Sequence, residues 1–400
     1  MTHSAQRRTA LIMFLALAYA LGPFTIDPFT ASFPSIGSTF GVNTALLQYS
    51  MTGVTVGMGL GQLVAGPFAD SVGRKIPMTV AIGLYVLGAF ASAAAPNIWV
   101  FIAMRTVMAI GSSGAAVIAA AIVRDSATGD AMLKMLSRIF WVQGISPLAA
   151  PILGAQLIQV VDWRTIFQIF GGVAALALIW SLRLKETLDP AKRNGSVFGG
   201  MGKRFGYVLK DRSYQGLLVI GVITTVQLYA YLNLFPFLFL NLLHVDKSTY
   251  GLLAGSVSLS WLIGFQFSAA IAPRWGYLRT LGLAMIFGIA AGIGGLTIGT
   301  SNVTQPIFMV MVYLAILAFG MSGGPLQTLA LAPHGDEAGT AAALLGTLSF
   351  LVTSLISPLF TMLPTDSMSG LSSVVLVSYL AGLAAIWFVI HPALRHSQLR

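Results

Sequence analysis

Two ionisable residues, Asp27 and Arg105, fall well inside long apolar segments of this 400-residue chain. A charged group in lipid is costly unless it is paired or hydrated, so such residues are functional candidates by default. A carboxylate beside an arginine is held ionised, whereas burial without a partner favours its protonated form. A change in hydration, or in the distance to Arg105, would therefore change the proton affinity of Asp27. This is the physical requirement for coupling a conformational change to proton uptake.

Two other interpretations of the same residues remain open at this point. Asp27 and Arg105 could form a permanent ion pair that only stabilises the fold. Arg105 could also be a clamp that binds a substrate directly.

The composition identifies the environment of these charges. The chain is 56% hydrophobic and only 8% charged, with a mean hydropathy of +0.84, whereas globular domains average about 25% charged residues. Apolar stretches of about 20 residues, long enough for an α-helix to cross a bilayer, recur along the sequence. The chain is therefore expected to be a polytopic helical membrane protein.

We expect twelve membrane spans, with a long polar connection at residues 184–213. This connection divides the chain into two six-helix bundles, residues 1–183 and 214–400. The spans are expected at residues 9–33, 44–68, 76–95, 98–122, 133–160, 163–183, 214–241, 248–271, 278–299, 305–330, 338–362 and 370–391.

The first apolar stretch follows Arg7 and Arg8, so a signal peptide is the alternative to a retained helix. No A-x-A-like site ends the stretch, and many further spans follow, which favours a retained helix. Asp27 lies 18 residues beyond Thr9, roughly 27 Å along this helix, and Arg105 lies about 10 Å into a span that begins outside. Both residues are therefore expected in the outer part of the membrane.

The basic residues indicate the orientation. If both termini are cytoplasmic, every Lys and Arg lies on the cytoplasmic side apart from Arg105, Arg164 and Lys247. This asymmetry follows the positive-inside rule. The net charge of +10 is then explained by topology, and a nucleic-acid partner is not expected.

The sequence offers little for cofactor or enzyme chemistry. It has no cysteine, and its five histidines show no ligand spacing, so we expect no metal and no cofactor. A membrane-embedded enzyme needs clustered carboxylates, histidines or a nucleophile pair. A single embedded acid and no D-x-x-D pair argue against an enzyme.

The segment from Gly66 to Lys75 reads Gly-Pro-Phe-Ala-Asp-Ser-Val-Gly-Arg-Lys. It resembles the loop signature G-x-L-A-D-R-x-G-R-K of the major facilitator superfamily, with Ser71 in place of the first Arg. The matching positions are Asp70, Gly73, Arg74 and Lys75. The resemblance implies an all-α fold of twelve transmembrane helices in two six-helix bundles. It also implies a cytoplasmic gate in which these residues act as a charge latch between the halves.

A similar turn recurs in the second half. Residues 69–75 follow the second expected span, and residues 272–279 follow the eighth, each with glycine and basic residues. Halves related by duplication are a known transporter architecture.

Other segments extend the resemblance. Arg105 followed by Gly111 and Gly114 is similar to the R-x-x-x-G-x-G pattern of the superfamily. The fifth expected span resembles the antiporter signature G-x-x-x-G-P-x-x-G-G, with the key positions Gly144, Pro147, Pro151 and Gly154 on one helix face. Trp163 to Phe167 matches W-R-x-x-F, which we interpret as an anchor at the membrane interface.

The most specific resemblance is to the drug–proton antiporters of the bicyclomycin-resistance (Bcr/CflA) branch. Residues 26–34, Ile-Asp-Pro-Phe-Thr-Ala-Ser-Phe-Pro, resemble the branch's I-D-M-Y-L-P-A-L-P, with Asp27 and Pro34 kept. Residues 121–125 resemble its A-x-V-R-D. This implies that Asp27 carries the proton and that Arg105 modulates it.

Aromatic residues offer a lining for a binding pocket. Gln227, Tyr231 and Phe235 repeat at i, i+4 spacing and form one stripe, and Phe24 lies on about the same face as Asp27. Aromatic rings suit bulky lipophilic ligands and stack on cations. A packing or lipid-facing stripe is equally common. Gln227 is the strongest candidate, because an amide facing lipid would be costly.

Together these observations predict a multi-pass protein of the bacterial plasma membrane that exports small amphipathic or lipophilic compounds in exchange for protons. Antibiotics of the phenicol or bicyclomycin type are the expected cargo, with Phe24, Asp27, Arg105, Gln227, Tyr231 and Phe235 as the binding residues. The alternative is proton-coupled uptake or export of a metabolite by the same fold. A monomer in the lipid bilayer is expected.

Overall fold

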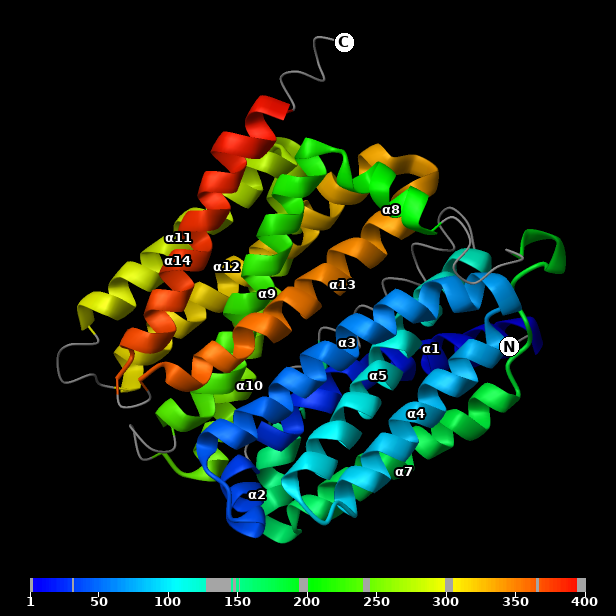
Figure 1. The fold of residues 1–400 in the computed structure, drawn as a ribbon, viewed down its shortest axis with the longest axis horizontal. Helices are drawn as coiled ribbons and strands as arrows, with labels where there is room; N and C mark the ends of the chain where they lie inside the picture. Colours follow the sequence, from blue (N-terminus) through cyan, green and yellow to red (C-terminus); the bar gives the residue numbers. More distant parts are fainter. Residues whose placement is uncertain are drawn as a thin grey trace. The chain divides into compact units, whose positions relative to one another are not determined.

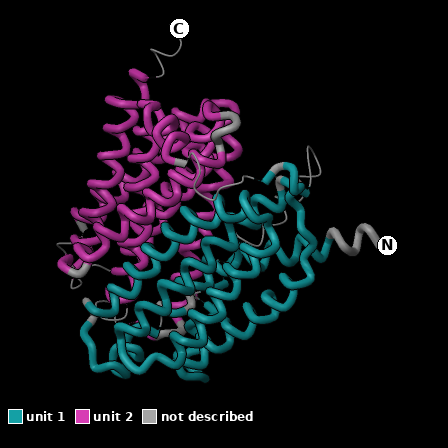
Figure 2. The backbone as a smooth tube through the Cα atoms, turned by 45° about the vertical axis from the view of Figure 1, so that its right-hand side comes forward, with its two compact units in different colours: residues 1–199 teal, residues 200–400 magenta. Residues whose placement is uncertain are grey.

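The structure is a computed structural model that describes residues 3–30, 32–126, 145–146, 149–150, 152–193, 201–239, 245–298, 305–364 and 367–393. The chain divides into two compact units, residues Met1–Gly199 and Gly200–Arg400. Figure 2 shows that each unit is a bundle of long helices.

The first unit is built from long helices and one short helix. Its helices are α1 (His3–Thr30), α2 (Phe33–Phe40), α3 (Thr44–Val72), α4 (Lys75–Ala93), α5 (Ile98–Ser126) and α7 (Trp163–Leu182), followed by the short 3-10 helix η1 (Pro190–Lys192). Residues 152–160 are also helical. In Figure 1 the helices α3, α5, α4 and α7 run side by side, as their contacts require.

The second unit repeats this construction. Its helices are α8 (Met201–Leu209), α9 (Arg212–Phe237), α10 (Lys247–Trp275), α11 (Tyr277–Ile298), α12 (Gln305–Leu331), α13 (Ala338–Ile356) and α14 (Ser369–Ala385). Short 3-10 segments, η3 (Ala332–Glu337) and η4 (Ser357–Met362), flank α13, and the π-helical η5 (Ile386–Ile390) extends α14.

The packing pattern within the two units is the same. In the first unit α5 packs against α1, α3 and α4, and α7 packs against α1 and α4. In the second unit α12 packs against α9, α10 and α11, and α14 packs against α9 and α11. The weak sequence repeat at residues 69–75 and 272–279 therefore corresponds to a repeat of the tertiary packing.

Glycines permit the closest of these helix contacts. A Cβ atom at Gly57 would overlap the carbonyl oxygen of Thr106 on α5, and one at Gly264 would overlap that of Leu317 on α12. The two positions lie at equivalent helix pairs, α3–α5 and α10–α12. In a membrane, where lipid is as apolar as the side chains, such close backbone packing contributes much of the association energy.

The repeated turns also share a backbone conformation. Gly73, between α3 and α4, has a φ of 106°, and Gly276, between α10 and α11, has a φ of 94°. A residue with a side chain adopts such angles only at a cost. Both turns therefore need glycine at the same place, as the sequence similarity indicated.

The expected spans can be compared with these helices. Within the residues that the structure describes, ten helices are long and apolar enough to cross a membrane. The expected span 44–68 lies in α3, which is helical but falls below that level of hydropathy because glycine, threonine and glutamine interrupt it. The expected span 133–160 lies largely outside the described residues.

The expected connection 184–213 is partly structured. Leu184 and Leu188 are buried, and α8 packs against α9 and α13 of the second unit. Both ends of the connection therefore contribute to the bundles that they join.

Candidate functional site

Arg105 lies on α5 and is fully buried, with 0% of its surface exposed. Its Nη2 atom donates a hydrogen bond to the backbone carbonyl of Thr25 on α1, at 2.7 Å. Its Cζ atom lies 5.3 Å from the ring centre of Phe29, 5.9 Å from that of Phe101 and 5.8 Å from that of Phe167. Residues from α1, α5 and α7 therefore enclose the guanidinium group.

The three rings contribute mainly by excluding water. Phe29 and Phe167 stack with their ring centres 3.8 Å apart and an interplanar angle of 12°. Because Cζ of Arg105 is 5.3 and 5.8 Å from these two centres, it lies beside the stack and not over one aromatic face. Cation–π attraction requires the face of a ring. The rings therefore desolvate the charge, and polar groups must balance it.

Asp27 lies in the same helical segment that contacts Arg105. The structure places it in α1, but its side chain is outside the described part of the structure. Thr25 and Phe29, two residues before and after it, both contact Arg105. The pairing of Asp27 with Arg105 stays a prediction, and its backbone position is compatible with it.

Phe24, the other predicted binding residue on α1, is partly exposed. Its ring stacks on Phe170 of α7, with centres 5.1 Å apart. Its role in substrate binding stays a prediction.

The W-R-x-x-F segment, which we expected to be an anchor at the membrane interface, packs inside the first unit, and its position relative to the interface stays a prediction. Trp163 is only 1% exposed, and its Nε1 atom donates a hydrogen bond to the hydroxyl of Thr39 at 3.0 Å. Arg164 donates to the carbonyl oxygens of Ala93 and Ala95, at 2.8 and 3.3 Å. These are carbonyls that the C-terminal end of α4 leaves without helical partners. The segment therefore holds α7, α4 and α2 together.

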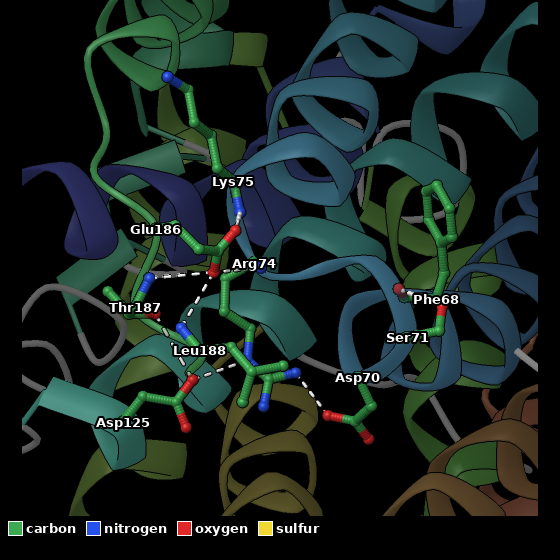
Figure 3. Close-up of polar contacts among 9 residues, drawn as sticks. All are labelled: Phe68, Asp70, Ser71, Arg74, Lys75, Asp125, Glu186, Thr187 and Leu188. Atoms are coloured by element: carbon green, nitrogen blue, oxygen red, sulfur yellow. Dashed lines mark hydrogen bonds and ion pairs between the residues drawn. The ribbon is translucent and has the colours of Figure 1, made fainter. Parts of the chain in front are cut away.

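The cytoplasmic loop motif is centred on Arg74 (Figure 3). Its guanidinium group forms ion pairs with Asp70 through Nη1 and with Asp125 through Nε, at 2.7 Å. Burial alone would lower the pKa of Arg74, but hydrogen bonds and charge from Asp125 and Asp70 outweigh it and raise the pKa. Arg74 therefore connects the end of α3 to the end of α5 while permanently charged.

A third carboxylate, that of Glu186 in the segment after α7, completes the cluster. It accepts hydrogen bonds from the backbone N–H groups of Arg74 (2.8 Å), Lys75 (3.3 Å), Thr187 (2.9 Å) and Leu188 (3.0 Å). Partial burial raises the pKa of Glu186, but these four donors outweigh it and leave the pKa below its usual range. A carboxylate at the N-terminal end of α4 also interacts favourably with the helix dipole.

Glu186 explains why Gly73 of the motif must be glycine. Besides its positive φ, a Cβ atom at Gly73 would overlap the carboxylate of Glu186. At the equivalent Gly276 of the second unit, a Cβ atom would meet no described atom within 4 Å. The carboxylate cap is thus a feature of the first turn.

Sequence reasoning missed Glu186. The available signal was an acidic residue among the basic residues Arg183 and Lys185, immediately after the sixth expected span. Asp125 was noticed only as part of a resemblance, and its contact with Arg74 was not expected.

The other residues that the sequence predicts for the gate have simpler surroundings. The side chain of Lys75 is partly exposed and points away from the carboxylates in Figure 3. The hydroxyl of Ser71, which replaces the usual Arg, donates to the carbonyl of Phe68 in its own helix, at 2.9 Å. Gly66 has room for a Cβ atom, which would lie 3.8 Å from Val117. The ion pairs of Arg74 with Asp70 and Asp125 lie within its own unit, so a latch between the halves stays a prediction.

The antiporter-like segment is described only in part. Gly144, Pro147 and Pro151 lie outside the described residues, whereas Gly154 is buried in helical backbone. The prediction that these residues share a packing face stays untested.

In the second unit, Gln227 lies on α9 and is 1% exposed. The hydroxyl of Tyr379 on α14 lies 3.4 Å from its Oε1 atom and 3.1 Å from the carbonyl oxygen of Ala315 on α12. Its Nε2 atom has no hydrogen-bond partner among the described residues. Turning the amide by 180° would let Nε2 donate to Tyr379 while Tyr379 donates to Ala315.

Tyr231 and Phe235 belong to a packed aromatic cluster. Phe235 is 1% exposed and lies 4.6 Å from Tyr231, 4.4 Å from Phe239, 5.8 Å from Tyr250 and 6.2 Å from Phe308, measured between ring centres. In this conformation these rings pack the interior of the second unit. Their role in substrate binding stays a prediction.

In the part of the chain that the structure describes, no three His, Asp or Glu side chains come together as the ligands of one metal ion would.

Comparison with known proteins identifies the class. The sequence profile of the Major Facilitator Superfamily matches residues 13–358. The chain also resembles the solved structure of a D-xylose–proton symporter, with a TM-score of 0.73, 16% identity, and coverage of 95% of this chain and 96% of that one. This chain is therefore a membrane transporter with the twelve-helix fold, and not an enzyme.

Relatives in sequence agree. An uncharacterized MFS-type transporter of Bacillus subtilis, YdgK, is 33% identical over 89% of each chain. The multidrug resistance protein MdtL of Vibrio parahaemolyticus is 26% identical over 83% of this chain and 84% of its own. The bicyclomycin resistance protein homolog of Haemophilus influenzae is 24% identical over 90% and 92%.

The chain belongs to the Major Facilitator Superfamily, and its relatives support the drug-efflux branch. The apolar helices and bacterial relatives identify it as a multi-pass protein of the bacterial inner membrane.

Proposed function

We propose that this transporter exports small amphipathic drugs, such as phenicol- or bicyclomycin-like antibiotics, in exchange for protons. One observation carries the proposal: a fully buried arginine, Arg105, contacts the residues two positions before and after the only acid expected inside a span, Asp27. The names of the relatives, multidrug resistance and bicyclomycin resistance, support the choice of cargo.

The proposed mechanism uses the charge balance of this site. Because the aromatic rings exclude water, the charge of Arg105 depends on polar partners within the protein, and an ionised Asp27 would be a strong one. A proton arriving from outside neutralises Asp27 and weakens the interaction between α1 and α5. Release of the proton inside restores it, and the two arrangements correspond to opposite openings of the transporter.

The other predicted residues take supporting roles in this proposal. Phe24, Gln227, Tyr231 and Phe235 contribute to substrate binding. Asp70, Arg74 and Lys75, with Gly66 and Gly73, form the cytoplasmic gate. The segment with Gly144, Pro147, Pro151 and Gly154 provides a packing face for helix movement. The transporter works as a monomer.

The test is a drug-susceptibility panel in a bacterium that lacks its own exporters. Wild-type protein should protect the cells, whereas Asp27→Asn and Arg105→Ala should not. Asp189→Asn, which removes an exposed acid of the same charge, is the matched control and should protect fully. If both site variants protect as well as wild type, the proposed coupling site is wrong.

Reconstituted vesicles distinguish export from the alternative. Under an imposed pH gradient an antiporter moves drug against the direction of proton flow. A proton-coupled importer of the same fold would instead accumulate its substrate along with protons. Asp27→Asn should stop uphill movement and retain downhill exchange. A permanent structural ion pair would instead leave this variant unfolded or thermally unstable.

A further inference from the structure

A buried tyrosine next to Arg105 has no role in the mechanism above. Tyr85 lies on α4 and is 0% exposed. Its hydroxyl is close enough to interact with the side chain of Thr25 and with the charge of Arg105. Gly111 of α5 allows this approach, because a Cβ atom at that position would come within 2.5 Å of the backbone nitrogen of Tyr85.

The Tyr85 hydroxyl has no partner with hydrogen-bond geometry in the described part of the chain. Other buried tyrosines satisfy theirs: Tyr214 donates to the carbonyl of Ala341 at 2.6 Å, and Tyr379 to that of Ala315 at 3.1 Å. An unsatisfied hydroxyl in a dry interior is destabilising, and a phenylalanine of the same shape would avoid the cost. The hydroxyl at position 85 is thus costly in this conformation.

We propose that Tyr85 becomes the hydrogen-bond partner of the Arg105 guanidinium in the state in which Asp27 is protonated. Arg105 already donates to the Thr25 carbonyl, and the Tyr85 hydroxyl lies beside Thr25, so a small movement of the guanidinium end brings the two together. The hydroxyl oxygen accepts an N–H of Arg105 and so replaces part of the carboxylate interaction that protonation weakens. Tyr85 is then a positioning residue that stabilises the protonated state.

The surrounding charges allow this interpretation. Among the described residues, α4 packs against α3, α5 and α7, and α1 packs against α5. Between their ends these helices carry few ionisable side chains: Tyr19 and Asp27 on α1, Tyr49 on α3 and Arg105 on α5. Arg164 on α7 is engaged at the C-terminal end of α4. Asp27 is the acid that the sequence predicts beside Arg105, and its protonation would remove the negative charge that balances the guanidinium group.

This inference rests on the proposed proton coupling, and its first test is independent of transport. Tyr85→Phe should leave the melting temperature (Tm) of the purified protein unchanged or raise it by about 1–2 °C. In an Asp27→Asn background, which imitates the protonated acid, the same substitution should lower Tm. An identical effect of Tyr85→Phe in both backgrounds would overturn the proposal.

If Asp27→Asn does not fold, the same sign change is measured with Asp27 in place. Tyr85→Phe and wild type are compared over a pH series from mildly alkaline to acidic, because a lower pH favours the protonated form of the acid. The matched control is Tyr214→Phe, which removes a satisfied hydroxyl far along the chain. It should lower Tm under every condition. If Tyr85→Phe lowers Tm at every pH as this control does, the hydroxyl of Tyr85 has only a structural role and the proposal is refuted.

The second test is transport. Tyr85→Phe should slow uphill transport by about tenfold or more, because hydrogen bonds to charged groups are among the stronger ones. It should also shift the pH of half-maximal transport to a value lower by about one unit, because the protonated state has lost a stabilising contact. Wild-type rate with unchanged pH dependence would refute the role of Tyr85. If transport by the wild-type protein does not depend on the pH gradient, proton coupling is refuted. The Tm comparison still tests the role of Tyr85 in that case.

Discussion

Glu186 provides the sharpest test of the cytoplasmic cluster, because a single side chain accepts four backbone hydrogen bonds. Two of the donors, Arg74 and Lys75, lie at the N-terminal end of α4, at 2.8 and 3.3 Å. The other two, Thr187 and Leu188, hold the segment that follows α7, at 2.9 and 3.0 Å. The perturbation is a pair of substitutions, Glu186→Ala and Glu186→Gln.

The expected magnitudes follow from this geometry. Loss of a capping side chain costs about 1–2 kcal/mol, at the lower end here because Glu186 is exposed and water can reach the freed N–H groups. Gln keeps an acceptor oxygen and loses the charge at the helix N-terminus, which costs about 0.3–1 kcal/mol. For a unit of about 200 residues, Glu186→Ala should lower Tm by about 2–4 °C and Glu186→Gln by about 1–3 °C.

The assay is thermal unfolding of purified protein between neutral and acidic pH. The folded pKa of Glu186 is lowered from its usual 4.5. Its charge therefore contributes stability that is complete above about pH 4.5 and is lost as the pH falls through the lower folded pKa. The difference between wild type and Glu186→Gln should shrink over that interval. Asp189→Asn, which removes an exposed acid of the same segment, should show no comparable loss.

Two results would refute this reasoning. One is a Glu186→Gln variant as stable as Asp189→Asn at neutral pH. The other is a Tm difference between wild type and Glu186→Gln that stays constant as the pH falls below the pKa of Glu186, since a neutralised carboxyl group cannot stabilise the helix end through its charge.

Three further predictions concern contacts of single residues. Gly73→Ala should lower stability by about 1–3 kcal/mol because of its positive φ. The loss should be smaller in the Glu186→Ala background, which lacks the overlapping carboxylate. A double-mutant cycle in Tm measures this difference, and fully additive effects of the two substitutions would contradict the overlap. Arg74→Lys should lower stability by about 1–3 kcal/mol and reduce drug protection, because the single ammonium nitrogen of lysine cannot bond two carboxylates as the two guanidinium nitrogens of Arg74 do. A variant with the same Tm as wild type would show that the contact with Asp125 is unimportant. Tyr379→Phe should lower Tm by about 2–4 °C through the lost hydrogen bond to a carbonyl, and an unchanged Tm would mean that this bond contributes nothing.

Several features of this protein were predictable from the sequence because they depend on local composition. Apolar stretches of about 20 residues are required by the bilayer thickness, so the all-helical membrane fold followed directly. The loop motif around Arg74 identified the superfamily, and the glycine pattern indicated a turn at Gly73 and its counterpart. The isolation of Asp27 and Arg105 in apolar surroundings identified candidate residues without any knowledge of the fold.

The partners of these residues were decided only by tertiary structure. Arg74 and Glu186 are 112 positions apart, and no periodicity connects them, so the cap on α4 could not be read from the chain. The packing of Trp163 against α2 and α5, which buries it, could not be read from its position at the start of an apolar segment. The unsatisfied hydroxyl of Tyr85 is likewise invisible in the sequence, because a tyrosine in an apolar span gains or lacks a partner only through the helices that pack around it.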